Sequence, residues 1–360
     1  MTQDALKLMA YIGERHRVNG QFVSDKLLDL FGSANIASSA LFRGAGGFGL
    51  KHHLRTDQSL TMSEDLPVAA LAVDIEQRIE SIVADVRRAT TGGLVTLERA
   101  RLLRDDLSTV ILPDAQNEAT KLTIYVGRQE RIYRVPAFIG VCDLLHRRSV
   151  AGASVLLGVD GTFHGRRERA RFFDSNSDVP VMITAVGTGP GIARVLPELG
   201  ALLRRPLVTL ERVRVCKRDG VLLQRPRALP AVDRQGRPLW QKMMVYTSES
   251  ALHHGRPIHR EIIRRLRHSR RCRGVTALRG IWGFHGDHAP HGDRLFQLGR
   301  HVPVMTILVD TPENIAASFD VIDGLTAEHG LVTVETVPAL TDGEDTYTGG
   351  GPMTLARDSF

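Results

Sequence analysis

The chain has little cysteine, few aromatic residues and no long apolar run, and each shortage excludes a class of protein. Its three cysteines, Cys142, Cys216 and Cys272, lie far apart and form no CxxC pair, which excludes a zinc knuckle and a disulfide scaffold. Aromatic residues make up 5% of the chain, too few for a surface that binds nucleic acid by base stacking. The longest apolar runs, such as residues 66–73, are far too short to span a membrane.

The length and the net charge of the chain set broad limits on its domain number and its partners. A chain of 360 residues predicts two or three domains, and a net charge of +7 favours anionic partners. Residues 1–17 lack the apolar stretch and cleavage site of a signal peptide. We therefore expect a cytoplasmic protein that does not insert into a membrane.

Three segments of the chain begin and end alike. Their starts, KLMAYIGER, KLTIYVGRQ and KMMVYTSES, begin at Lys7, Lys121 and Lys242. A short apolar strand follows and ends in glycine 37, 37 and 38 residues later, at Gly44, Gly158 and Gly280. The segments close with GLVTLERA, PLVTLERV and GLVTVETV. Matching order and spacing indicate three copies of one unit.

The repeats divide the chain into three units, two linkers and a tail. The units are predicted at 1–103, 121–216 and 242–340. The linkers are 104–120, which is acidic, and 217–241, which is rich in proline. The tail, 341–360, lacks apolar periodicity and is predicted to be disordered.

Within each unit the patterns predict the order strand, helix, strand, strand, helix, strand. Apolar residues of the second helix of unit one recur at helical spacing, at Ile75, Ile79, Ile82, Val83 and Val86. In unit three, Thr311 followed by proline is a typical helix start. This order predicts an α+β fold of ferredoxin-like (βαββαβ) units, each a four-stranded antiparallel sheet with two helices on one face. The other face of each sheet must be covered by something else.

Several motifs of the units resemble one known family. They are Tyr11–Arg15, Gly20, Arg43–Gly49, Ser63–Val68 and Gly93–Glu98, with partial counterparts in unit three. On these residues the units are similar to the PII-like domain-of-unknown-function family 190, related to the nitrogen regulatory PII proteins. Unit two departs most, because Arg134 replaces the counterpart of Gly20 and Asp160 that of Gly46.

The resemblance implies an architecture and a role. PII-like proteins form trimers whose sheets face a central axis and hold small molecules in clefts between subunits, so three linked units imply an intrachain pseudo-trimer that is monomeric. Three-fold closure would also bury the three bare sheet faces. The implied role is non-catalytic signalling, in which a small anionic ligand, such as an adenine nucleotide, alters a loop that contacts a transporter or channel.

The loop expected after the second strand of unit one is the first candidate binding element. Gly44, Gly46, Gly47 and Gly49 would allow positive φ and close approach to a ligand. Lys51, His52 and Arg55 could then meet phosphate oxygens. The alternative is a glycine-rich hairpin with a solvated basic tip, since neither GxGxxG nor the Walker spacing is present.

The corresponding loops of units two and three carry different chemistry. In unit two Arg166 and Arg169 lie in a basic loop, within a unit that has fifteen basic residues and eight acidic ones. In unit three Gly283 and His285 correspond to the unit-one motif. His285, His288 and His291, with carboxylates between them, are candidate ligands for zinc, copper or nickel, although their loop position does not fix a geometry.

Two further classes of function remain open from the sequence. The unit-three histidines would suit a metal-binding protein of the copper-tolerance type, and the arginine-rich stretch 264–273 would suit a nucleic-acid-associated protein. The apolar spacing of Ile258, Ile262, Ile263 and Leu266 instead places those arginines on the exposed face of a helix. We expect neither a metal cofactor nor nucleic acid as a partner. No motif of a known catalytic type is present, so we also expect no enzyme.

Overall fold

The computed structural model describes most of the three predicted units. The described residues are 2–49, 51–56, 65–104, 107, 110, 112, 118–163, 166–169, 179–234, 236–285, 290–292 and 302–342. Much of the predicted linker 104–120 and residues 343–360 of the predicted tail lie outside this description.

Unit one follows the predicted order of elements. Its main elements are β1 (Thr2–Gly13), α1 (Val23–Ser33), β4 (Ser38–Phe48), β6 (Pro67–Ile75), α2 (Glu76–Ala89) and β7 (Leu94–Arg104). Short strands are β2 (Arg17–Val18), β3 (Gln21–Phe22) and β5 (Arg55–Thr56). The sheet order is β4-β6-β1-β7, and all three pairings are antiparallel.

Unit two repeats this pattern with a divided second strand. Its main elements are β8 (Glu118–Gly127), α3 (Ala137–Arg147), β11 (Gly152–Leu157), β12 (Asp160–Phe163), β14 (Pro180–Gly187), α4 (Gly189–Leu202) and β15 (Leu207–Arg218). Short strands are β9 (Arg131–Ile132), β10 (Val135–Pro136), β13 (Arg166–Arg169) and β16 (Val221–Leu222). Strand order β11-β14-β8-β15 matches that of unit one.

Unit three also has a divided second strand. Its main elements are β17 (Trp240–Ser248), α5 (Ile258–Ser269), β20 (Val275–Arg279), β21 (Trp282–His285), β23 (Pro303–Asp310), α6 (Pro312–Leu325) and β24 (Leu331–Val337). Short strands are β18 (Leu252–His253), β19 (Arg256–Pro257), β22 (His291–Gly292) and β25 (Ala339–Asp342). The hydroxyl of Thr311 accepts a hydrogen bond from the backbone of Asn314, which confirms the predicted start of α6.

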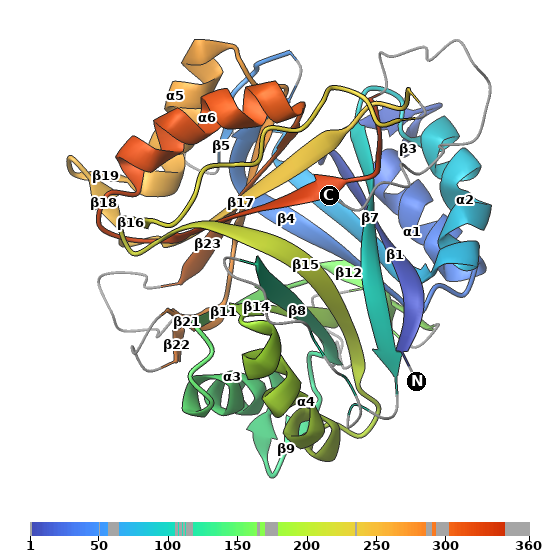
Figure 1. The fold of residues 1–360 in the computed structure, drawn as a ribbon. Helices are drawn as coiled ribbons and strands as arrows, with labels where there is room; N and C mark the ends of the chain where they lie inside the picture. Colours follow the sequence, from blue (N-terminus) through green and yellow to red (C-terminus); the bar gives the residue numbers. More distant parts are fainter. Residues whose placement is uncertain are drawn as a thin grey trace.

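Each unit has its own core, and a fourth core is shared. Figure 1 shows the pairs α1 and α2, α3 and α4, and α5 and α6 at three separate outer positions, with the strands between them. The apolar face of each pair packs on its own sheet, as Ile79, Phe31 and Phe319 illustrate. The opposite sheet faces meet in the shared core, which contains Phe42, Met182 and Met305. The bare faces expected from the sequence are therefore covered by one another.

Backbone hydrogen bonds join every pair of units into one 19-stranded sheet. The first half of β4 pairs with β12, and its second half pairs with β20. The corresponding strands β11 and β21 pair with each other. The last strands also pair across units, β15 with both β7 and β24, while β25 returns to β7. The pairings of the second strands thus connect the three units in a closed cycle, and so do the pairings of β7, β15, β24 and β25.

The glycine-rich segment of unit one is a strand, so the prediction of a loop there was wrong. Gly44, Gly46 and Gly47 belong to β4 and pair with β20 of unit three. Gly44 and Gly46 do not have positive φ, and Gly47 is close to extended with φ of 159°. Glycine is required here for close approach between strands, not for a turn. The tight turns lie elsewhere, after β2 and its counterparts, where Arg134 has the same left-handed backbone as Gly20.

Three equivalent glycines allow the second strands of neighbouring units to come together. A Cβ atom added to Gly47, Gly161 or Gly283 would lie 2.2, 2.2 or 2.3 Å from a carbonyl oxygen of the adjoining unit. Those distances are far below van der Waals contact, and backbone cannot yield as a flexible side chain can. We call each place where the second strands of two units pair a seam. Each seam requires glycine, which has no side chain, at this position.

We expect Gly161→Ala to reduce the free energy of unfolding by about 1–3 kcal/mol, because its methyl group would overlap the backbone of Ser39. Urea unfolding followed by circular dichroism measures this. Gly49→Ala is the matched control, since a Cβ there meets no atom of the described residues within 4 Å. Equal stability of the two variants would contradict the role assigned to the seam.

Candidate functional site: a cavity between units two and three

Six charged side chains meet where the three sheets face one another. They are Lys7, Lys121 and Lys242 from the first strands and Glu98, Glu211 and Glu335 from the last strands. Lys121 Nζ lies 2.7 Å from Glu211 and 2.6 Å from Glu335, and Lys242 Nζ lies 2.6 Å from Glu335 and 2.5 Å from Glu98. Lys7 contacts Glu211 and lies 3.3 Å from Glu98, which closes the ring. We call these six residues the axial ring.

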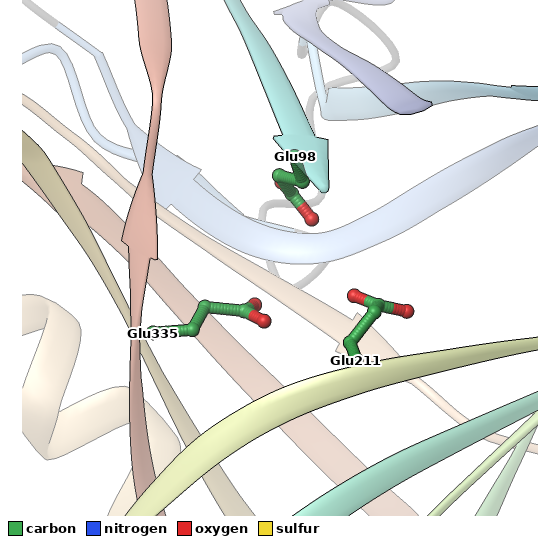
Figure 2. Close-up of side chains that lie close together, drawn as sticks. All are labelled: Glu98, Glu211 and Glu335. Carbon is green, nitrogen blue, oxygen red and sulfur yellow. The ribbon is translucent and has the colours of Figure 1, made fainter. Parts of the chain in front are cut away.

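Figure 2 shows the three carboxylates of the axial ring pointing toward one centre from β7, β15 and β24. One oxygen from each lies within 4.8 Å of the others, a spacing that could hold a cation. Three ammonium groups already lie between the carboxylates, so the ring is neutral by itself. A metal ion would have to displace a lysine, and we assign the ring a structural role.

Burial and charge act against each other in the axial ring. Burial alone would raise the pKa of Glu335, but the positive charges of Lys121 and Lys242 outweigh it and lower the pKa. Burial alone would lower the pKa of Lys121, yet Glu211 and Glu335 raise it above its ordinary value. For Lys7, burial prevails over Glu211 and the pKa is lowered. A carboxyl whose pKa is depressed on folding stabilises the fold above its unfolded value of about 4.5 and loses that effect as the pH falls below it.

We expect Lys121→Met to destabilise the fold by about 3–5 kcal/mol at pH 8, because one buried negative charge is then uncompensated. Protonation of one carboxyl would restore neutrality, so the pKa of that group is raised on folding and the loss should shrink as the pH falls toward 5.5. Urea unfolding at both pH values measures the effect, with the unsubstituted protein as reference. A deficit that stays constant with pH would contradict this account.

A cavity of about 590 Å³ lies between units two and three, beside the β11–β21 seam. Unit two contributes β11 and β14, and unit three contributes β17, β21 and the turn before β24. The lining residues are Gly152, Ala153, Ser154, Thr184, Val186, Tyr246, Thr247, Ser248, Ser250, Ala251, Gly283, Phe284, His285, Pro303, His329, Gly330 and Leu331.

The lining of this cavity is mostly apolar, with hydroxyl groups at intervals. Among the described residues that form it, none is a lysine, arginine, aspartate or glutamate. The side chain of Thr247 is buried, and its hydroxyl has no hydrogen-bond partner within the described residues. Burying a hydroxyl without a partner costs free energy, so this group offers a hydrogen bond to a bound molecule. Burial raises the pKa of the neighbouring Tyr246 to about 12, and its phenol therefore stays protonated.

Two histidines stand at the more exposed side of the cavity. The side chain of His285 is 40% exposed, and its Nε2 contacts a carboxylate oxygen of Asp219. His329 is 62% exposed and lies 3.9 Å from Glu328. Both imidazoles thus lie at the rim next to acidic groups.

The other two seams carry bulkier residues at an equivalent position. Thr184 of β14 pairs with Thr123, which is two residues after the ring lysine of unit two. The residues that pair with the corresponding positions, Met9 and Met244, are Leu71 in unit one and Ile307 in unit three. Substitution of threonine for these larger aliphatic residues leaves more room, and a hydroxyl, at the seam between units two and three.

The predicted binding residues of unit one do not converge on this cavity. Gly44, Gly46 and Gly47 lie at the seam with unit three. Lys51 is exposed, whereas the His52 ring stacks on Phe48 with centroids 5.1 Å apart, and its carbonyl accepts a hydrogen bond from Arg267. Burial, followed by the charges of Arg270 and Arg267, lowers the pKa of His52. Gly49 follows the end of β4.

Arg55, predicted to meet an anion, is paired with a carboxylate instead. Its guanidinium lies 2.8 Å from Asp65, and Asp65 also accepts a hydrogen bond from the backbone of Arg15 at 2.6 Å. This pair connects the end of β1 to the segment before β6.

Several predicted site residues of units two and three are described only by their backbone, or lie outside the described residues. Arg166 and Arg169 belong to β13, which pairs with β12, but their side chains are not described. His288 lies outside the described residues, and only the backbone of His291 is described, in β22. Gly283 and His285 are the two predicted residues that line the cavity.

The arginine-rich helix has the apolar face that its spacing predicts. Ile258, Ile262, Ile263 and Leu266 are buried on α5. Hydrogen bonds from Arg264, partly opposed by burial, hold the pKa of Glu261 at about 2, so this carboxylate stays charged beside two arginines. Part of the basic charge on this face is thereby neutralised.

The axial ring and most of the cavity lining were missed by reasoning from the sequence. The ring had a visible signal, since each repeat begins with lysine and ends with a glutamate in the same motif. Ser154, Thr184 and Thr247 had no such signal, because they come from strands of two different units.

Comparison with known proteins agrees with this internal repetition. The model of one family, DUF190, described as "Uncharacterized ACR", matches residues 5–102, 119–215 and 240–339. The chain belongs to the DUF190 family. A "UPF0166 protein" of Aquifex aeolicus (strain VF5) is 29% identical over 98 residues, which is 27% of this chain and 90% of the relative. One unit of this protein thus corresponds to nearly the whole of that relative.

Within the described part of the chain, no helix combines the length and apolar character needed to cross a membrane.

Proposed function

We propose that this DUF190 protein is a non-catalytic, PII-like regulatory protein that binds a small molecule in the cavity between units two and three. In this proposal its three ferredoxin-like units form an intrachain pseudo-trimer. The observation that carries the proposal is the cavity itself, which is formed by two units and contains a buried hydroxyl that has no hydrogen-bond partner among the described residues. A ligand there would contact both units and favour their closed arrangement.

The pseudo-trimer is supported by the cyclic strand pairing and by the axial ring. Each unit supplies one lysine and one glutamate to the ring, and each contacts both of the others. Because the units are covalently linked, their association is intramolecular, with an effective concentration of about millimolar.

We expect the protein to be a monomer in solution, because the three sheet faces already cover one another. Multi-angle light scattering should give a mass near 39.7 kDa. A stable particle of about three chain masses would show that sheet faces are shared between chains instead.

The expected ligand class is an adenine nucleotide, implied by the family resemblance. A volume of about 590 Å³ falls within the range of small-molecule sites. The mostly apolar walls suit a planar base, and the hydroxyls of Ser154, Thr184 and Thr247 suit its polar edge or a ribose. The phosphates would extend toward the rim, where His285 and His329 lie. The regulated partner, a transporter or channel, likewise follows from the resemblance.

The proposal is tested by titration calorimetry with ATP, AMP and adenosine. We expect one site per chain, because the other two seams carry Leu71 and Ile307 in place of Thr184. Thr184→Leu should weaken binding at least about tenfold, since it fills the cavity and removes a hydroxyl. Leu71→Ile, a volume-conserving change at the equivalent position of unit one, is the matched control and should leave affinity unchanged.

Two results would overturn the proposed function. One is a folded Thr184→Leu protein that binds as tightly as the original. The other is the absence of binding by all three adenine compounds at millimolar concentration.

A further inference from the structure

A second, smaller cavity opens beside the axial ring. Its volume is about 280 Å³, and its walls come from β7, β8, β15, β17, β24 and the segment before β17. We call it the axial vestibule. Glu98 and Glu335 of the axial ring contribute to its lining, so the vestibule lies directly against the ring. It shares no lining residue with the cavity between units two and three.

The charge of the vestibule is strongly positive. Four arginines line it, Arg99, Arg212, Arg214 and Arg227. Glu98 and Glu335 do not compensate them, since both are paired with the lysines of the neutral ring. Glu118, 3.7 Å from Arg212, is the one further acidic residue among the described lining residues. Arg99 also interacts with Glu76, which lies outside the lining. With Glu118 and Glu76 both counted, the four arginines still outnumber the acidic groups that are not paired in the axial ring, which favours an anion.

The polar groups of the vestibule are ordered by neighbouring segments. Arg214 donates a hydrogen bond of 2.5 Å to the side chain of Gln224. Gln241 donates from Nε2 to the backbone carbonyl of Arg227, at 3.1 Å, which connects β17 to the segment between units two and three. The guanidinium of Arg214 is held in this way, and an ordered guanidinium recognises carboxylate or phosphate oxygens well, because little side-chain freedom is lost on binding.

An unused acceptor lies in the wall of the same cavity. Gln241 is 2% exposed, and its Oε1 has no hydrogen-bond donor within the described residues. A buried carbonyl oxygen without a donor is costly, and an anionic group alone would not satisfy it. A hydroxyl group on the same ligand would do so.

We propose that the axial vestibule binds a small, multiply charged anion that also carries a hydroxyl group, of the hydroxycarboxylate type. Its charged oxygens meet Arg212 and Arg227, and its hydroxyl donates to Gln241 Oε1. The three units do not contribute equally. Arg99 and Arg212 each follow a ring glutamate, but Thr336 stands at that position in unit three. These two arginines therefore come from units one and two, whereas unit three contributes Gln241 and residues of β24 to the lining.

Citrate is the probe for this site, measured by titration calorimetry on the full chain. We expect one site, with an affinity that falls as the salt concentration rises. Tricarballylate has the three carboxylates of citrate without its hydroxyl, and it should bind about fivefold more weakly. Arg212→Gln combined with Arg227→Gln should weaken citrate at least about tenfold. Arg87→Gln combined with Arg88→Gln on α2 removes the same charge elsewhere and should have little effect.

The proposed hydrogen bond from the ligand hydroxyl to Gln241 Oε1 is tested by a separate variant. Gln241→Leu should abolish the preference for citrate over tricarballylate while citrate still binds. Should Gln241→Leu fail to fold, the arginine variants still decide the matter. Loss of affinity in the Arg87 and Arg88 control equal to that in the vestibule variant would overturn the proposal, as would absence of citrate binding at low salt. Thr184→Leu should leave citrate binding intact, which separates failure here from failure of the proposed function.

Discussion

The axial ring is the interaction on which the arrangement of the three units depends. Burying a lysine or a glutamate alone would cost several kcal/mol, and six such groups are tolerable only when each meets opposite charges on both sides. Each unit contributes one charge of each sign. These two charges pair with each other within the unit, and each also contacts an opposite charge of a neighbouring unit. Such a ring contributes little net stability compared with an apolar core, but an arrangement that buried one of these charges away from its partners would be strongly destabilised.

The repetition predicted much of the fold. Spacing alone located three units, and the periodicity of Ile79 and Val86 placed the second helix of unit one correctly. The glycine-rich segment was predicted wrongly because Gly47 and its neighbours pair with β20, more than 200 residues away, as well as with the short strand β5. Local sequence contains no information about such a partner, and glycine by itself is typical of turns and infrequent in strands, which favoured the prediction of a loop.

The cavity was harder to anticipate than the fold. Many of its lining residues are serines, threonines and glycines on strands of two units, and no local motif groups them. Thr184, where the other units have Leu71 and Ile307, leaves space in the cavity. The charged residues that drew attention in the sequence were instead neutralised locally, as Arg55 is by Asp65 and Arg264 by Glu261. Prediction from the sequence therefore favoured conspicuous charges over the small side chains that line the cavity.

The cyclic pairing of strands has a consequence for how the chain comes apart. The second strand of each unit is hydrogen-bonded to both neighbouring units, and β7, β15, β24 and β25 likewise connect all three units. Removal of one unit would therefore expose strand edges on the other two. In most multidomain chains a domain can open while the rest stays folded. Because the strands of the three units are interleaved, we expect the three units to unfold together, and amide hydrogens in all three sheets to share one slow exchange process.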